Sequence, residues 1–310
     1  PAQQAQPAMK IKANGIELAL EDSGGPGPAV LLVMGLGGQL IHWPAGLVQG
    51  LADAGYRVLR FDNRDAGLST HFTAHGTPRI PWIATQAWLG RRPRVPYTLS
   101  DMAADAVGVL DALAVPNAHI VGLSMGAMVA QRVALAAPQS VRSLVSIMGS
   151  SGARGLLKPK PALLRVAASK SKARGDAALA AYYVRFLQAI ASPRFGPSDE
   201  ALLAMFRRTA QRHAPDNAAT YRQLAAILAD GERADQLARI QRPTLVVHGA
   251  DDPWVPPVCG EDTARRIPGA RLAIIPDMGH DLAPVAHPEI VRRVLAVLLP
   301  FLQDHDEERA

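Results

Sequence analysis

Short apolar runs recur along the chain and alternate with segments of helical period. Runs of this kind are typical of strands buried on both faces of a parallel sheet. They comprise Ala29–Met34, Arg57–Phe61, Ala118–Leu123, Val141–Met148, Thr244–His248 and Ala270–Ile275. Helical segments such as Ser100–Val115 and Met125–Ala137 lie between most of them. Because strand and helix alternate, we predict an α/β fold whose mostly parallel central sheet is flanked by helices through right-handed crossovers.

Two local patterns refine this prediction near the start of the chain and before one helix. Apolar side chains alternate with others along Ile16–Glu21, which predicts a half-buried strand. Asn14-Gly15 stands between this strand and Met9–Lys12, so we predict a hairpin with a tight turn. Ser100 stands where the N-cap of the following helix is expected, with an aspartate in the first turn.

The alternation stops between Met148 and Thr244. This stretch has no good strand pattern and contains only segments of helical period, such as Ala178–Ile190 and Glu200–His213. We therefore predict a helical insertion between two strands of one sheet. The predicted parts are a flexible N-terminal tail (1–8), a core (9–150 and 242–303), an inserted helical cap (151–241) and a polar C-terminal tail (304–310).

Composition limits the class of protein. Hydrophobic residues make up 48% of the chain and charged residues 19%, which excludes wholesale disorder. No stretch approaches about 18 uninterrupted apolar residues, so a transmembrane helix is not expected. The single cysteine, Cys259, allows neither an intramolecular disulfide nor a metal cage of cysteines. The first residues lack the apolar region of a secretory signal. We therefore expect a cytoplasmic rather than a secreted protein. This expectation covers only residues 1–310, because the sequence starts without Met and residues upstream could be missing.

The formal net charge of +6 comes from one part of the chain. The segment Arg154–Arg242 contains 16 Lys or Arg against 7 Asp or Glu, whereas the rest contains 17 against 20. These cations are scattered and do not alternate with aromatic residues, so we expect no nucleic-acid partner. Two interpretations of the segment stay open: a solvated Arg-rich surface, or a surface that meets an anionic partner or substrate.

The most specific motif is Gly122-Leu123-Ser124-Met125-Gly126, between a predicted strand and a predicted helix. A serine on such a turn exposes its hydroxyl from a strained backbone, and the two glycines provide the room that the turn needs. A catalytic nucleophile is therefore the favoured interpretation of Ser124, and a merely structural serine is the alternative.

A nucleophilic serine needs a histidine base and a carboxylate that orients the histidine. At an elbow of this kind the acid and then the base follow the serine along the chain. The strand Thr244–His248 runs into Gly249-Ala250-Asp251-Asp252-Pro253. We select Asp252 as the acid because Pro253 fixes the turn after it. Asp251 remains the alternative, as a loop carboxylate that caps or is solvated.

Three histidines follow these carboxylates in the sequence. His280 lies in a loop directly after the strand Ala270–Ile275, which places it at the same sheet edge as Ser124. It is therefore the candidate base. His287 precedes a proline near a helix start and His305 lies in the charged tail, so we interpret both as surface residues.

An oxyanion hole needs two backbone N–H groups directed at one point. Met125, at the start of the elbow helix, offers one of them. The glycine-rich loop Gly35-Leu36-Gly37-Gly38 offers the other, which we place at Leu36. A glycine turn that serves only to reverse the chain is the alternative.

The chain resembles the α/β-hydrolases over nearly its whole length, from about Met9 to Leu302, and in particular bacterial carboxylesterases that include anthracycline methylesterases. The matching stretches are Val33-Met34-Gly35 with the glycines after it, Phe61–Thr70, Val121–Ala127 and Ile275–His280. The resemblance implies an α/β-hydrolase fold with a cap and cleavage of a small-molecule carboxylic ester through an acyl-enzyme. By the same analogy Ser124 is the nucleophile, Asp252 the acid and His280 the base. Many relatives have His-Gly at Met34-Gly35, which puts a role for a side chain there in doubt.

Several features of the sequence bear on other possible functions. The loop after Met34 and the acidic residue Asp62 echo a dinucleotide fingerprint, but Leu40 stands where a small residue is needed. Ser124 excludes hydrolases that use an aspartate at the elbow. A lactonase, a cofactor-free haloperoxidase or perhydrolase, and an acyltransferase share the same triad and stay open. A non-catalytic small-molecule-binding relative would usually lose a triad member. No metal-ligand spacing occurs, so no metal or organic cofactor is expected.

The segment His71–Tyr97 is the candidate rim of the site. It follows a strand, so it should lie on the active-site side of the sheet, and no regular structure is expected in it. We predict that it packs against the basic segment and that Trp82 and Trp88 help to wall an apolar substrate tunnel. In the alternative, these tryptophans anchor the loop to the core or to a second subunit of a homodimer. Gly37 and Trp254 are further candidate substrate-binding residues.

Overall fold

A computed structural model describes residues 8–156, 158, 160–169, 175–231 and 233–306. The expected N-terminal tail, apart from Ala8, lies outside the described residues, as do residues 307–310 of the expected polar tail. Within the described part of the chain, no helix is long and apolar enough to cross a membrane.

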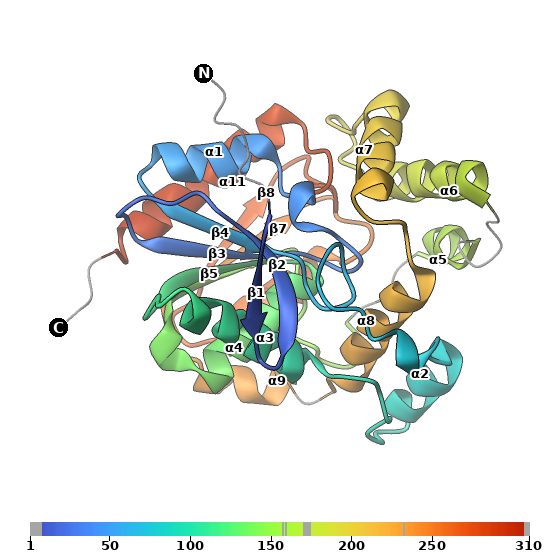
Figure 1. Ribbon diagram of the computed structural model, residues 1–310, viewed down its shortest axis with the longest axis horizontal. Helices are drawn as coiled ribbons and strands as arrows, with labels where there is room; N and C mark the ends of the chain where they lie inside the picture. The colour runs from blue at the N-terminus through green and yellow to red at the C-terminus, as the bar shows by residue number, and fades with distance from the viewer. Residues whose placement is uncertain (1–7, 157, 159, 170–174, 232, 307–310) are drawn as a thin grey trace.

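A single mixed sheet forms the centre of the molecule (Figure 1). Its strands stand in the order β1-β2-β4-β3-β5-β6-β7-β8. The β1–β2 and β2–β4 pairs are antiparallel, and all later pairs are parallel. The strands are β1 (Met9–Ala13), β2 (Ile16–Asp22), β3 (Ala29–Val33), β4 (Arg57–Phe61), β5 (Ala118–Leu123), β6 (Val141–Ile147), β7 (Thr244–Gly249) and β8 (Arg271–Ile275). The predicted α/β fold is therefore confirmed, with the predicted hairpin at its first edge.

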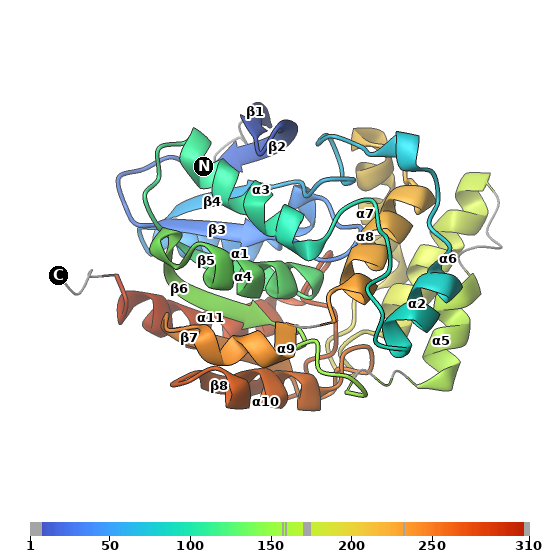
Figure 2. The same ribbon diagram turned by 90° about the horizontal axis from the view of Figure 1, so that it is seen from below.

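The helices of the described residues lie on both faces of this sheet and beyond one end of it. They are α1 (Ala45–Asp53), α2 (Ile80–Trp88), α3 (Leu99–Ala112), α4 (Met125–Ala136), α5 (Pro161–Ala168), α6 (Gly175–Ala189), α7 (Asp199–Arg212), α8 (Asn217–Ala229), α9 (Arg233–Gln236), α10 (Pro257–Arg266) and α11 (Pro288–Gln303), with 3₁₀ turns at Leu40–His42, Thr73–His75, Pro138–Ser140 and Leu237–Arg239. Helices α1 and α11 pack on one face, and α3 and α4 on the other (Figures 1 and 2). The side chains of β3 show why both faces of the sheet are covered. Leu31 and Val33 point into the α3–α4 side, whereas Val30 and Leu32 point into the α1–α11 side, because successive residues of a strand alternate between faces.

Between β6 and β7 the chain forms α5 to α9 and no strand among the described residues. We refer to residues 151–241 as the cap. Helices α5 to α8 lie beyond the carboxyl ends of the parallel strands, at the same end of the molecule as α2 (Figure 2). The strand order reverses at β3, whose neighbours are β4 and β5. In an open parallel sheet, ligands bind at the carboxyl ends of strands beside such a reversal.

The N-cap of α3 is not Ser100, as the sequence suggested, but Thr98. Thr98 Oγ1 accepts a hydrogen bond from Asp101 N (3.2 Å), and the Asp101 carboxylate accepts one from Thr98 N (2.7 Å). This reciprocal pair satisfies two N–H groups at the start of the helix, so the N-cap lies two residues earlier than the pattern indicated.

The segment His71–Tyr97 also differs from the expectation, because it contains the helix α2. Pro81 stands in its first turn, where proline has no hydrogen bond to lose. The helix packs against α8 of the cap, and Ile83 is its buried residue. The predicted contact between this segment and the basic part of the chain is therefore present, but through a helix.

Candidate active site

Ser124 stands on a sharp turn between β5 and α4. Its backbone has φ 56° and ψ −116°, a conformation that costs a non-glycine residue free energy. A Cβ atom at Gly126 would lie 2.0 Å from the carbonyl oxygen of Val33, and one at Gly122 would lie 2.1 Å from the carbonyl oxygen of Gly126. Both positions therefore require glycine. The turn packs close enough to β3 to hold the serine at the end of the sheet.

The structure brings Ser124, His280 and Asp252 together. His280 Nε2 lies 3.0 Å from Ser124 Oγ, and His280 Nδ1 lies 2.6 Å from Asp252 Oδ2. The three residues follow the ends of β5, β7 and β8 at one edge of the sheet, and Ser124 and His280 are 156 residues apart in sequence. The order nucleophile, base and orienting carboxylate is the arrangement that activates a serine.

Asp252 is placed for this role more closely than Asp251. Its side chain is buried, and Oδ1 accepts hydrogen bonds from Trp254 N (2.9 Å) and Val255 N (2.8 Å). These bonds fix the carboxylate so that Oδ2 faces His280. Asp251 is exposed, and its N–H donates to the carbonyl oxygen of Met278.

The loop that carries His280 is held by the cap. His280 N donates to the carbonyl oxygen of Ile190 (2.8 Å), and Gly279 N donates to Ser192 Oγ (2.9 Å). Ser192 in turn donates from Oγ to Asp281 Oδ1 (2.5 Å) and from N to Asp281 Oδ2 (2.7 Å). Burial raises the pKa of the Asp281 carboxyl, and the bonds from Ser192 partly offset this. No sequence pattern singled out Ser192 or Asp281.

The glycine-rich loop lies directly against the serine. A Cβ atom at Gly35 would lie 3.3 Å from Ser124 Cβ and 3.2 Å from the carbonyl oxygen of Leu123. The loop closes with a hydrogen bond from Gly38 N to Gly35 O (3.1 Å). Leu36 and Gly37 line the same cavity as Ser124, and Met125 follows Ser124 as the first residue of α4. The two residues whose N–H groups the sequence named as oxyanion donors therefore lie close to Ser124, Leu36 in the wall of the shared cavity and Met125 next to Ser124 in the chain.

A cavity of about 260 Å³ opens on Ser124 and His280. Its cap side is apolar and aromatic, and includes Leu179, Tyr182, Tyr183, Phe186, Leu187, Ile190 and Phe206. Trp254 also lines it, and its ring makes a T-shaped contact with the ring of Phe186 (5.2 Å between centroids). Its polar end includes His42, His71, Thr209, His213, Asp216 and Asn217. A largely apolar chamber with a few converging polar groups is typical of a small-molecule site.

Trp82 and Trp88 do not belong to this cavity, contrary to the expectation that they wall a tunnel. Their side chains are 63% and 79% exposed, and neither is among the lining residues. The cause is the orientation of α2. The face with Ile83 packs inward beside α8, which turns both tryptophans outward.

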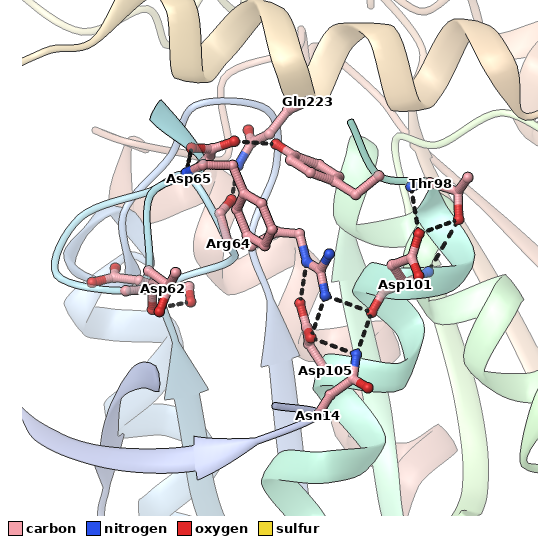
Figure 3. A network of polar contacts seen from close by, with 12 residues as sticks. Asn14, Asp62, Arg64, Asp65, Thr98, Asp101, Asp105 and Gln223 are labelled. Carbon is pink, nitrogen blue, oxygen red and sulfur yellow. Dashed lines mark hydrogen bonds and ion pairs between the residues drawn. The ribbon is translucent and has the colours of Figure 1, made fainter. Parts of the chain in front are cut away.

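Buried ion pairs join the cap to the loop after β4. Arg212 of α7 pairs with Asp62 (2.7 Å), and Arg222 of α8 pairs with Asp65 (2.7 Å). Asp65 also accepts a hydrogen bond from the hydroxyl of Tyr97 (2.7 Å), next to the network around Arg64 in Figure 3. Breaking one partner of such a pair leaves a buried charge, which is costly. Charge counts along the sequence assigned these arginines to a surface, but here they serve the junction between cap and core.

Among the residues that the structure describes, no group of three or more His, Cys, Asp or Glu side chains is arranged so that it could hold a metal ion.

The chain matches the model of the alpha/beta hydrolase fold over residues 28–285. It is 29% identical to the rhodomycin D methylesterase DauP of Streptomyces sp. (strain C5), over 94% of this chain and 97% of that protein. It is 32% identical to a putative carbamate hydrolase, RutD, of Variovorax paradoxus (strain S110), over 82% of this chain and 85% of that protein. Among solved structures, its fold is similar to that of the meta-cleavage product hydrolase CumD of Pseudomonas fluorescens IP01, with a TM-score of 0.71, 18% identity and coverage of 96% and 97%.

Proposed function

We propose, from the premise that this chain belongs to the alpha/beta hydrolase fold family, that it hydrolyses carboxylic esters of small molecules through a covalent acyl-enzyme. Relatives named as a methylesterase and a putative carbamate hydrolase support hydrolysis at an acyl carbon. The observation that carries the proposal is the pair of hydrogen bonds from His280, to Ser124 Oγ on one side and Asp252 Oδ2 on the other.

These two hydrogen bonds support a specific role for each of the three side chains. Because an ionised carboxylate only accepts hydrogen bonds, His280 donates from Nδ1 to Asp252 and keeps the lone pair of Nε2 facing Ser124. Nε2 takes the proton of Ser124 Oγ as Oγ forms a bond to the ester carbonyl carbon. Asp252 stabilises the imidazolium that results.

The remaining steps use the backbone around the serine. The N–H groups of Leu36 and Met125 hold the negative oxygen of the tetrahedral intermediate. As the carbon–oxygen bond to the alcohol breaks, Nε2 returns its proton to the alcohol oxygen. Water then attacks the acyl carbon by the same route, with His280 as base, and releases the acid and Ser124.

We further propose that residues 9–150 and 242–303 act as the catalytic core and that the cap closes the site. Cap residues such as Tyr183 and Phe186 form the wall opposite Ser124, and Ile190 and Ser192 bind the His280 loop. A wall of apolar side chains excludes water from the acyl group and selects its shape.

The test is covalent labelling by a fluorophosphonate, which reacts only with an activated serine. We expect one adduct, located at Ser124 by peptide mass spectrometry, that is absent from Ser124→Ala and from heat-denatured protein. A folded wild-type protein without this adduct would overturn the esterase proposal and leave a binding role. A panel of p-nitrophenyl esters, lactones and a chloride-plus-peroxyacid assay then separates ester hydrolysis from the lactonase and haloperoxidase alternatives.

A further inference from the structure

Gln223, in α8 of the cap, joins two loops of the core. Its side chain is completely buried, and Oε1 accepts a hydrogen bond from Gly37 N at 2.7 Å. At the other end of the amide, Nε2 donates to the carbonyl oxygen of Arg64 at 2.8 Å. Figure 3 shows Gln223 above the loop that carries Arg64. Since both ends of the amide are used, the side chain has one orientation.

The partners of Gln223 are themselves fixed. The Arg64 guanidinium pairs with Asp105 through two hydrogen bonds of 2.6 and 2.7 Å, and it also reaches the carbonyl oxygen of Asp101 (Figure 3). On the cap side, the neighbouring Arg222 binds both oxygens of Asp65 at 2.8 and 2.7 Å. Helix α8 therefore cannot slide along the core without breaking buried charged contacts.

Gly37 belongs to the turn that supplies the proposed oxyanion donor. The turn has a hydrogen bond from Gly38 N to Gly35 O, and Gly37 has φ +67°. A positive φ at the third residue is the arrangement of a type II turn. The type I alternative differs by a flip of the central peptide, which here joins Leu36 to Gly37. That flip would turn Gly37 N–H away from Gln223, so the 2.7 Å bond favours one of the two turns.

The same turn separates α8 from the serine. A Cβ atom at Gly37 would lie 3.3 Å from Thr220 Oγ1 of α8, and one at Gly35 would lie 3.3 Å from Ser124 Cβ. The peptide of Leu36 N is held by the Gly38–Gly35 bond, and the next peptide is held by Gln223. With both planar units fixed, the two dihedral angles of Leu36 between them are fixed as well.

We propose that Gln223 is a positioning residue for ester hydrolysis, which holds the Leu36–Gly37 peptide and with it the shape of the turn that carries the proposed oxyanion donor, Leu36 N–H. This rests on the proposed function. Gln223 does not line the cavity, so it makes no contact with the bound ester in its ground state. Its loss should therefore lower kcat by about 10- to 100-fold and leave KM within about twofold, because only the charged intermediate needs the donor.

The experiment compares Gln223→Met, which keeps the length and loses both hydrogen bonds, with Gln223→Asn, which keeps the amide but is too short. Gln188→Met is the matched control, because Gln188 is an exposed cap glutamine on α6 whose amide binds Pro197 O and Asp199. The readouts are kcat and KM for p-nitrophenyl acetate and the inhibition constant of a trifluoromethyl ketone. That ketone forms an oxyanion on the active serine.

We expect the inhibition constant of both Gln223 variants to rise by the same factor as kcat/KM falls, and Gln188→Met to behave like wild type. A mainly structural role would instead lower the melting temperature and the active fraction, with an unchanged inhibition constant per active site, and would overturn the inference. Wild-type kcat in a folded Gln223 variant would also overturn it. If wild-type protein takes up no fluorophosphonate, the proposed function itself has failed. If wild-type protein is labelled but the Gln223 variants have wild-type kcat and inhibition constants, only the inference about Gln223 has failed.

Discussion

In the proposed reaction His280 acts first as a base and then as an acid, and the residues around its ring hold it in the tautomer that both steps need. His280 presents Nδ1 to a carboxylate that already accepts two backbone hydrogen bonds, so Asp252 cannot rotate away without losing them. The ring is thus held in one tautomer with Nε2 toward Ser124. A substitution that removes the hydrogen bond between Asp252 and His280 Nδ1 is therefore expected to lower activity, because it frees the ring to adopt the other tautomer.

Substitution of the triad tests these roles directly. We expect Ser124→Ala and His280→Ala each to lower kcat by about 10⁶, because the triad acts as a unit. Asp252→Asn should lower it by about 10⁴, since an amide at this position favours the wrong tautomer. Steady-state hydrolysis of p-nitrophenyl acetate measures the loss, and Asp251→Asn is the control for the neighbouring carboxylate. If Asp251→Asn proved the more damaging of the two, Asp252 would not be the acid.

At the scale of elements, the position of a helix start depends on which side chain reaches the free N–H groups. In α3 this is Thr98, which exchanges hydrogen bonds with Asp101, while Ser100 is exposed within the first turn. Both residues are good N-caps by type, so the sequence pattern alone could not choose between them.

The cap assignment predicts unequal effects of two similar substitutions. Thr98→Ala should lower the free energy of unfolding by about 1 kcal/mol, because Asp101 N then loses its acceptor. Ser100→Ala should change it by no more than about 0.5 kcal/mol, as expected for an exposed position without such a contact. Urea denaturation at neutral pH measures both values. Equal losses would show that Thr98 is not the effective cap.

The orientation of α2 leads to a second prediction at this scale. Trp82→Ala and Trp88→Ala should leave the ratio of kcat/KM for octanoate and acetate esters unchanged, because both side chains are exposed. Each should change the free energy of unfolding by no more than about 0.5 kcal/mol. Trp254→Ala is the matched comparison and should change the ratio, since Trp254 lines the cavity. A change of chain-length preference in the Trp82 or Trp88 variant would restore the tunnel-wall interpretation.

At the scale of the whole molecule, the junction between cap and core is polar and buried. His42 of the core lies in it, and its Nε2 is 2.8 Å from Thr209 Oγ1 of the cap. Thr209 donates its own proton to the carbonyl oxygen of Met205, so His42 must donate from Nε2. Its Nδ1 then accepts from Gln39 N. If the His42 ring were protonated, its Nδ1–H would point at the N–H of Gln39, so two donors would face each other. Burial, with the charges of Arg212 and Arg208, lowers the pKa of His42 to about 4.

This lowered pKa makes folding stability depend on pH. Between pH 6.5 and about 4 the unfolded chain binds a proton at His42 and the folded protein does not, so the free energy of unfolding falls as pH falls through this range. The lowered pKa of His42 accounts for at most about 3 kcal/mol of the decrease in the free energy of unfolding across this pH range. Urea denaturation at pH 7 and pH 5 should show a smaller decrease in His42→Gln than in wild type. Burial also lowers the pKa values of His119 and His248, and their contribution is common to both proteins. An identical decrease in both proteins would contradict the role of His42.

The sequence by itself determined the features that depend on local pattern. Continuous apolar runs predict the strands of the parallel sheet, alternation along Ile16–Glu21 predicts a half-buried strand, and the glycines around Ser124 predict a tight elbow after β5. Because parallel strands end at one edge, it also predicted that His280 and Asp252 would lie near Ser124, as their hydrogen bonds show. Each of these conclusions needs only a few neighbouring residues and the geometry of a parallel sheet.

Only the tertiary structure decided how the cap helices meet the core. Gln223 contacts Gly37 across 186 residues, and Arg212 contacts Asp62 across 150. Nothing in a glutamine or an arginine on a helix of ordinary pattern indicates such a partner. The same holds for Trp82 and Trp88, whose exposure depends on the side of α2 that packs on α8. These contacts depend on how a whole helix docks, which is set by the sum of many distant side-chain contacts and not by any local run of residues.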